Sequence, residues 1–153
     1  MNYQNSLVTS AIQPEILAAL TTQICDWWTE DFSGSAKGVG DEFTVRFGNT
    51  FKTFVVTELS STRVAWKCLD SYIDMPDLNK KDEWKGTTIH CGIGSDGQQN
   101  NLQMFHEGLT PEIECFDVCQ QGWISFFASL KNWLETKEGH PYEVPKESYK
   151  QQV

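Results

Sequence analysis

The sequence predicts a single α+β domain in which a curved antiparallel sheet wraps around one long C-terminal helix. The length of 153 residues fits one domain of ordinary size. Between residues 43 and 106, short segments of alternating apolar and polar residues follow one another, separated by turn signals. Residues 112–136 lack proline and repeat apolar residues every three or four positions, which is typical of an amphipathic helix.

The N-terminal part is predicted to hold a strand, two short helices and a loop. Ser6–Ile12 is the strand. Pro14 suits the first position of a helix, because its ring presets φ and its missing N–H would be unpaired there anyway. Glu15 follows in the first turn, where the helix dipole favours an acidic residue. A second helix is predicted over Ile24–Trp28, and three glycines make Phe32–Gly40 a loop.

A series of strands comes next, joined mostly by short turns such as Gly48-Asn49 and Gly94–Gly97. Short turns favour antiparallel pairing of neighbouring strands, so we expect a meander. Alternation places two sets of inward residues on one face: Ile89, Cys91 and Ile93, then Leu102, Met104 and His106. The predicted strands are Phe43–Phe47, Phe51–Leu59, Val64–Leu69, Trp84–Ile93 and Leu102–His106.

The helix predicted from Glu112 to Thr136 is the longest element. At about 1.5 Å per residue it exceeds roughly 30 Å, enough to cross a whole sheet. Its apolar face must cover the apolar face of the sheet. After it, Lys137–Val153 contains two prolines and little periodicity, which predicts an extended tail that packs on the surface or is partly disordered. We therefore divide the chain into a domain at 1–142 and a tail at 143–153.

The charge balance excludes several classes of partner. The chain has 12 basic and 21 acidic residues, for a net charge of −9. Because nucleic-acid affinity comes largely from Lys and Arg, we expect neither nucleic acid nor an anionic membrane surface as a partner. No apolar run approaches the roughly 18 residues that a membrane helix needs. No signal peptide is visible at the N-terminus, so a cytoplasmic location is predicted.

Five cysteines, an odd number, argue against a disulfide framework, and no CxxC pair occurs. They are Cys25, Cys68, Cys91, Cys115 and Cys119. We expect free thiols in the core.

Several short motifs resemble one family when their order is considered. Trp84–Ile89 reads WKGTTI, and His106–Cys115 reads HEGLTPEIEC. Other matching segments are Gln13–Glu15, Ala19–Thr21, Trp27-Trp28, Arg63–Trp66, Cys119, Gly122-Trp123 and Ser129–Lys131. Over residues 6–142 the chain resembles the activator-of-heat-shock-protein-90-ATPase homologue family. That family belongs to the START-like, or SRPBCC, superfamily, which includes polyketide cyclases and lipid-transfer proteins.

The resemblance implies the helix-grip fold, the small single-domain bacterial kind of this family, and a pocket between the sheet and the long helix that accepts apolar ligands. A pocket of this kind usually measures about 300–1,000 Å³. No cofactor is expected. The predicted ligand-binding residues are Trp66, Ile89, Cys91, Leu102, Met104, His106, Cys119, Trp123 and Phe126.

Trp27 and Trp28 are predicted to form the entrance of this cavity, with the loop from Gly34 to Gly40 as a lid. Adjacent helical positions point about 100° apart, so we expect one of the two indoles to be partly exposed. Trp66 and Trp84 either line the pocket or fill the core.

His106 has two interpretations. It is either a general base in the pocket, tuned by burial, or a hydrogen-bonded core histidine that anchors the turn into the long helix. The second is favoured, so no catalytic residue is assigned beyond His106 as a candidate.

The start of the long helix carries further candidates. Cys115 and Cys119 lie four residues apart, where the helix dipole lowers the pKa of Cys115. Together with His106 they suggest a metal site, but no fourth ligand is visible and no metal is predicted. Glu107, Glu112 and Glu114 are expected to act as structural caps.

Three functions follow. The first is binding of a small hydrophobic or amphipathic molecule, such as a lipid, without catalysis. The second is a cyclase- or hydrolase-like enzyme using His106 with a nearby acid. The third is an interaction protein, either a homodimer or a chaperone-associated stress-response partner, with an apolar surface around Trp27 or Trp133. The eukaryotic co-chaperone of the family has a separate N-terminal domain for which 153 residues leave no room, so a chaperone remains an alternative only.

Overall fold

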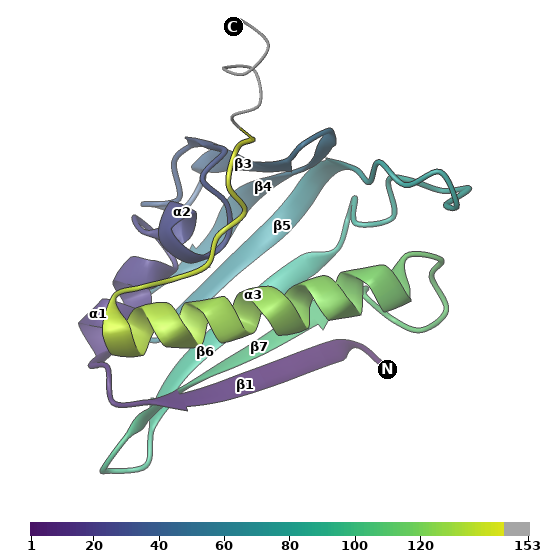
Figure 1. Cartoon of the computed structure of the whole chain (residues 1–153). Helices are drawn as coiled ribbons and strands as arrows, with labels where there is room; N and C mark the ends of the chain where they lie inside the picture. Colours follow the sequence, from purple (N-terminus) through teal and green to yellow (C-terminus); the bar gives the residue numbers. More distant parts are fainter. Residues whose placement is uncertain (146–153) are drawn as a thin grey trace, which may run out of the picture.

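The computed structural model describes residues 1–145 and confirms the predicted α+β fold. A seven-stranded antiparallel sheet curves around one long helix (Figure 1). The elements, in chain order, are β1 (Tyr3–Thr9), α1 (Gln13–Ala19), α2 (Ile24–Trp27), β2 (Phe32–Gly34), β3 (Glu42–Phe47), β4 (Thr50–Leu59), β5 (Arg63–Tyr72), β6 (Thr88–Ser95), β7 (Asn100–Glu107) and α3 (Phe116–Thr136).

The strand order is β1-β7-β6-β5-β4-β3-β2. Strands β2 to β7 form the expected meander, because each pairs with the next one along the chain. The first strand is the exception. It pairs with β7, with Tyr3 opposite His106 and Leu7 opposite Leu102.

Helix α3 lies across the concave face of the sheet, and the short helices α1 and α2 lie near the C-terminal end of α3 (Figure 1). The buried side of α3 contributes Cys119, Trp123, Phe127, Ser129, Leu130 and Leu134. Inward residues of the strands alternate with exposed ones, as a half-buried sheet requires. None of the helices in residues 1–145 is long and apolar enough to span a bilayer.

Two predicted boundaries near the N-terminus are wrong. The first strand covers Tyr3–Thr9 rather than Ser6–Ile12, because Ile12 is the N-cap of α1 and its N–H donates to Glu15 Oε1 at 3.0 Å. The segment predicted as a loop from Phe32 begins with β2, where Phe32 pairs with Val45.

Two later boundaries also differ. Trp84 lies in a turn before β6, not in the strand, and Gly86 in that turn has a φ of 90°. Helix α3 begins at Phe116 rather than near Glu112. The reason is a side chain from the loop between β5 and β6: the Glu83 carboxylate accepts the N–H groups of Glu114 at 3.1 Å and Cys115 at 3.0 Å, which fixes the turn before the helix.

The segment that follows α3 returns past α2 (Figure 1). Tyr142 exchanges backbone hydrogen bonds with this region, donating to Trp28 O and accepting from Glu30 N, both at 2.9 Å. Ser129 Oγ donates to Trp27 O at 2.9 Å and accepts the N–H of His140 at 2.6 Å. Residues 138–142 therefore belong to the packed structure. Most of the predicted tail, residues 146–153, lies outside the described residues, and the boundary at 142 stays a prediction.

Candidate ligand-binding pocket

A small aromatic cavity of about 170 Å³ lies between α3, the β3–β4 hairpin and the loop after β5. It is smaller than the predicted range because five aromatic rings and the long side chains of Ile73 and Met75 line it. Its lining residues are Trp28, Phe47, Thr50, Lys52, Ile73, Met75, Trp84, Val118, Cys119, Gly122, Trp123 and Phe126.

The cavity has a buried floor and a mouth at the surface. Trp28, Trp84 and Trp123 at the floor are each at most 3% exposed. Their rings pack together, with Trp28 5.2 Å and Trp84 6.0 Å from Trp123 between centroids. Around the mouth, Phe47 and Phe126 are partly exposed, with their ring centroids 5.5 Å apart. The cavity thus extends from partly exposed rings to buried ones.

Lys52 is the charged residue of this lining. It occupies an inward position of β4 with Phe54 and Val56, and it is only 8% exposed. Its Nζ lies 4.4 Å from the centroid of the Trp84 ring and 5.3 Å from that of Phe47, so cation–π contacts stabilise the ammonium. Burial lowers the pKa of Lys52, while the neighbouring thiols of Cys119, Cys115 and Cys68 raise it.

Cys119 lines the same cavity from the first turns of α3. Trp84 Nε1–H donates to its sulfur at 3.1 Å. Hydrogen bonding from the Cys115 thiol is the largest cause that lowers the pKa of Cys119, and the Lys52 ammonium and the Trp84 indole add to it. The pKa of Cys115 moves up instead, opposite to the prediction, because it gives its hydrogen bond to Cys119 and is buried.

His106 is fully buried and hydrogen-bonded at both ring nitrogens. Trp123 Nε1–H donates to Nδ1 at 3.0 Å. Thr87 Oγ1 lies 2.9 Å from Nε2 and donates its own proton to Trp84 O at 2.7 Å, so Nε2 carries the ring proton. Burial lowers the pKa of His106 to about 3, with a further contribution from Lys52. His106 is therefore a neutral link between the turn, β7 and α3.

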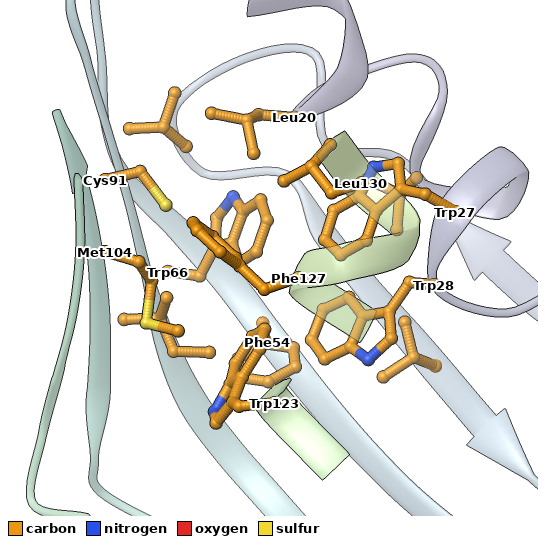
Figure 2. Packing of buried hydrophobic residues seen from close by; sticks show 14 of the residues in the cluster. Leu20, Trp27, Trp28, Phe54, Trp66, Cys91, Met104, Trp123, Phe127 and Leu130 are labelled. Atoms are coloured by element: carbon orange, nitrogen blue, oxygen red, sulfur yellow. The ribbon is translucent and has the colours of Figure 1, made fainter. Parts of the chain in front are cut away.

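The structure separates the predicted ligand-binding residues into two groups. Cys119, Trp123 and Phe126 line the cavity. The other six lie in the packed core behind it, where none exceeds 4% exposure; Figure 2 shows three of them among the rings of Phe54 and Phe127. These six are Trp66, Ile89, Cys91, Leu102, Met104 and His106.

The prediction that Trp27 or Trp28 is exposed is wrong, since they are 1% and 3% exposed. Their rings stack at 5.5 Å, with Trp27 beside Leu130 and Trp28 toward Trp123 (Figure 2). Trp27 Nε1–H donates to Ala19 O at 2.8 Å. Only Trp28 lines the cavity. Because Trp27 is buried, it cannot form part of the predicted surface for a partner. Trp133, the other residue predicted for that surface, is partly buried and donates its Nε1–H to Gln23 Oε1 at 3.0 Å.

The acidic residues before α3 have different partners from those predicted. The Glu114 carboxylate accepts the backbone N–H of Asn79 at 2.9 Å and of Lys80 at 2.8 Å, so it fixes the loop after β5 rather than its own helix. Glu107 pairs with His90 at 3.0 Å on the other face of the sheet. Within residues 1–145, no three His, Cys, Asp or Glu side chains converge on a point that would hold a metal ion.

Sequence reasoning missed Lys52, Phe47 and the loop residues Ile73 and Met75. The parity of β4 carries a signal for Lys52, because it shares a strand face with Phe54 and Val56. Loops have no such periodicity.

A broader hollow of about 940 Å³ lies over β1, β7 and β6, and several of its lining residues are polar: Gln4, Asn5, Ser6, Arg63, His90, Gln103 and Glu107.

No model of a protein family matches this sequence, and a search among curated proteins finds no match. Solved structures do match. The Aha1 dimer from Colwellia psychrerythraea superimposes with a TM-score of 0.73 at 28% identity, over 91% of this chain and 99% of that one. A protein from Mesorhizobium loti gives a TM-score of 0.68 at 16% identity, over 88% and 96% of the two chains.

A third match is DynU16, from the dynemicin biosynthetic locus, with a TM-score of 0.65 at 16% identity over 89% of this chain and 48% of that one. The last two matches, both at 16% identity, show the fold alone: an open curved sheet gripping a C-terminal helix, which is the helix-grip fold. Within this fold class, the match to Aha1 confirms the resemblance to the activator-of-heat-shock-protein-90-ATPase homologue family that the motifs predicted.

The motifs that carried this resemblance meet in the structure. Trp84 and Thr87 of the WKGTTI segment contact His106 of the HEGLTPEIEC segment, and Trp123 of α3 completes the link. Gly108 in the second motif has a φ of 103°, and a Cβ there would lie 2.6 Å from Thr87 Cγ2. The motif residues therefore shape the wall between the cavity and the core.

Proposed function

We propose that this protein binds a small apolar or amphipathic molecule in the cavity under α3, without catalysing a reaction. The observation that carries the proposal is the cavity itself, whose floor is made of indole rings and whose mouth reaches the surface. An apolar cavity of about 150 Å³ is known to hold a benzene-sized guest. The volume of about 170 Å³ thus suits a molecule of roughly that size or slightly larger.

Native mass spectrometry of the purified protein tests the proposal first, followed by thermal-shift measurements with small aromatic and short aliphatic compounds. We expect at least one of these classes to stabilise the protein and to quench tryptophan fluorescence, since three indoles line the cavity.

A blocking variant makes this test specific. Gly122 lines the cavity from α3, and a Cβ built there meets nothing within 4 Å, so Gly122→Leu extends a side chain into the cavity. Ser125→Leu, at an exposed position of α3, is the matched control. Binding should disappear in the first variant and persist in the second. Binding that survives Gly122→Leu would place the ligand elsewhere and overturn the proposal.

The enzyme alternative gains no support from the position of His106. Both of its ring nitrogens are engaged inside the core, and it is not among the residues that line the cavity. A general base must reach the proton that it removes, directly or through one water.

A homodimer is a second candidate property, because the Colwellia neighbour is described as a dimer. Light scattering coupled to size-exclusion chromatography measures it directly. A mass near 17.4 kDa at all concentrations would exclude a stable dimer. A chaperone partner stays a prediction.

A further inference from the structure

We propose that the ligand of this cavity is a small carboxylate, whose charge pairs with the Lys52 ammonium while its apolar body lies among the indole rings. This inference rests on the proposed function and adds the chemical class of the ligand to it. It stands on the position of Lys52, on the other polar groups of the cavity and on the size of the cavity.

Lys52 is a buried cation without a carboxylate partner among the described residues; the ionisable groups beside it are the thiols of Cys119, Cys115 and Cys68. The ion pairs of that part of the chain are Arg63 with Glu58, His90 with Glu107 and Lys137 with Glu15. Aspartate and glutamate are absent from the described lining of the cavity. A buried ammonium is costly unless a counter-charge compensates it, so a ligand that brings a carboxylate gains the pairing that the protein leaves open.

The hydroxyl group of Thr50, which also lines the cavity, favours a ligand with a hydrogen-bond acceptor. Thr50 Oγ1 accepts the backbone N–H of Asp74 at 2.9 Å, which leaves its own proton free to donate. Trp84 and Trp123 already donate their indole N–H groups to Cys119 and His106. The cavity therefore presents an ammonium and a hydroxyl donor on an aromatic surface, and a carboxylate accepts from both.

The size of the cavity limits the body of the ligand to about ten non-hydrogen atoms, as in phenylacetate or hexanoate. The net charge of −9 disfavours any general attraction of anions to this protein. Selectivity for a carboxylate must then come from direct contact with Lys52, so the anion must enter the cavity to be recognised.

The test compares phenylacetate with its neutral analogue phenylacetamide, and hexanoate with hexanol, by isothermal titration calorimetry at about 150 mM salt. Each ligand is titrated into the native protein, Lys52→Met and Lys67→Met. Met keeps the length of the lysine stem and removes the buried charge, so Lys52→Met should fold at least as well as the native protein. Lys67 is exposed on β5 and controls for the change in net charge.

We expect each carboxylate to bind the native protein and Lys67→Met roughly tenfold to a hundredfold more tightly than its neutral analogue, the range for hydrogen bonds to charged groups. In Lys52→Met this preference should vanish or reverse. Equal affinity for carboxylates and neutral analogues, or a preference that survives Lys52→Met, would overturn the inference and leave the proposed function intact. If neither series binds the native protein, both the inference and the proposed function fail.

Discussion

The surroundings of His106 and those of Lys52 lie side by side under α3, yet they treat a buried polar group in opposite ways. Every hydrogen-bonding atom of the His106 ring has a partner: Trp123 donates to one nitrogen and Thr87 accepts from the other. The Lys52 ammonium has only aromatic faces, thiols and a cavity around it. A fully satisfied group is explained by the fold, whereas an unsatisfied one needs another explanation. We therefore attribute a structural role to His106 and propose ligand binding beside Lys52.

The largest expected effect is on the side of His106. Replacing it in His106→Phe leaves the Trp123 indole N–H without an acceptor in the core, so the free energy of unfolding should fall by about 2–4 kcal/mol. Urea denaturation measures this loss. His90→Phe, which removes only a half-exposed pair with Glu107, is the control and should change stability by less than about 1 kcal/mol.

The same residue predicts a pH dependence. Because burial lowers the pKa of His106 to about 3, the unfolded chain binds a proton before the folded one does, near its ordinary value of 6.5. This histidine therefore reduces stability progressively as the pH falls from 6.5 toward 3. His106→Phe should lack that component. An unchanged acid profile would mean that His106 is not held neutral by the core.

The next effect has the opposite sign. Lys52→Met should raise the free energy of unfolding near neutral pH by about 1–3 kcal/mol, since it removes a buried charge and keeps its volume. Burial lowers the pKa of Lys52 below 10.5, so the folded protein loses this proton first as the pH rises. The advantage of the variant should therefore shrink toward pH 10.5. If Lys52→Met is less stable than the native protein, Lys52 has a structural role, as His106 does, and the two regions do not differ in the way proposed.

The rate at which Cys119 reacts with a thiol reagent also distinguishes the cavity beside Lys52 from the packed core. In a Cys25→Ser background, N-ethylmaleimide should modify Cys119 at least tenfold faster than Cys68 or Cys91, as followed by peptide mass spectrometry. Cys119 lines the cavity, and the pKa of its thiol is lowered, whereas burial raises the pKa of Cys68 and Cys91 to about 12. Lys52→Met should slow the reaction. Comparable rates at Cys91 and Cys119 would show that the cavity is closed.

Much of the fold could be predicted from the sequence, because it depends on periodicity. Alternation over Phe43–Phe47 and Phe51–Leu59 and the three-to-four spacing along α3 each fix which side of an element is buried. The pairing of β1 with β7 could not be predicted, since it joins segments about a hundred residues apart. The start of α3 could not either, because Glu83 fixes it from another loop.

The candidate site was predicted along α3 and at Trp28, which was expected at the cavity entrance and lines the cavity; for Trp84, which also lines it, the sequence left lining and core packing as alternatives. Helical periodicity is enough to place Cys119, Trp123 and Phe126 under the helix, where they line the cavity. The opposite wall depends on where the strands curve and where a loop returns, so Ile73 and Met75 carry no sequence signal. Lys52 does carry a sequence signal. Its place in the alternation of β4 predicts an inward side chain, although a charged residue is not expected there.

The smallest expected effect is at Gly122, and it tests how loosely the cavity end is packed. A Cβ at Gly122 meets nothing within 4 Å, so Gly122→Ala should gain helix propensity and raise the free energy of unfolding by about 1 kcal/mol. At Gly139, near α2, a Cβ would lie 2.2 Å from Asp26 O, and Gly139→Ala should be destabilising instead. Chemical denaturation of both variants measures the pair. A loss of stability in Gly122→Ala would mean that the helix closes over Lys52 more tightly than the cavity implies, which would leave no room for a ligand.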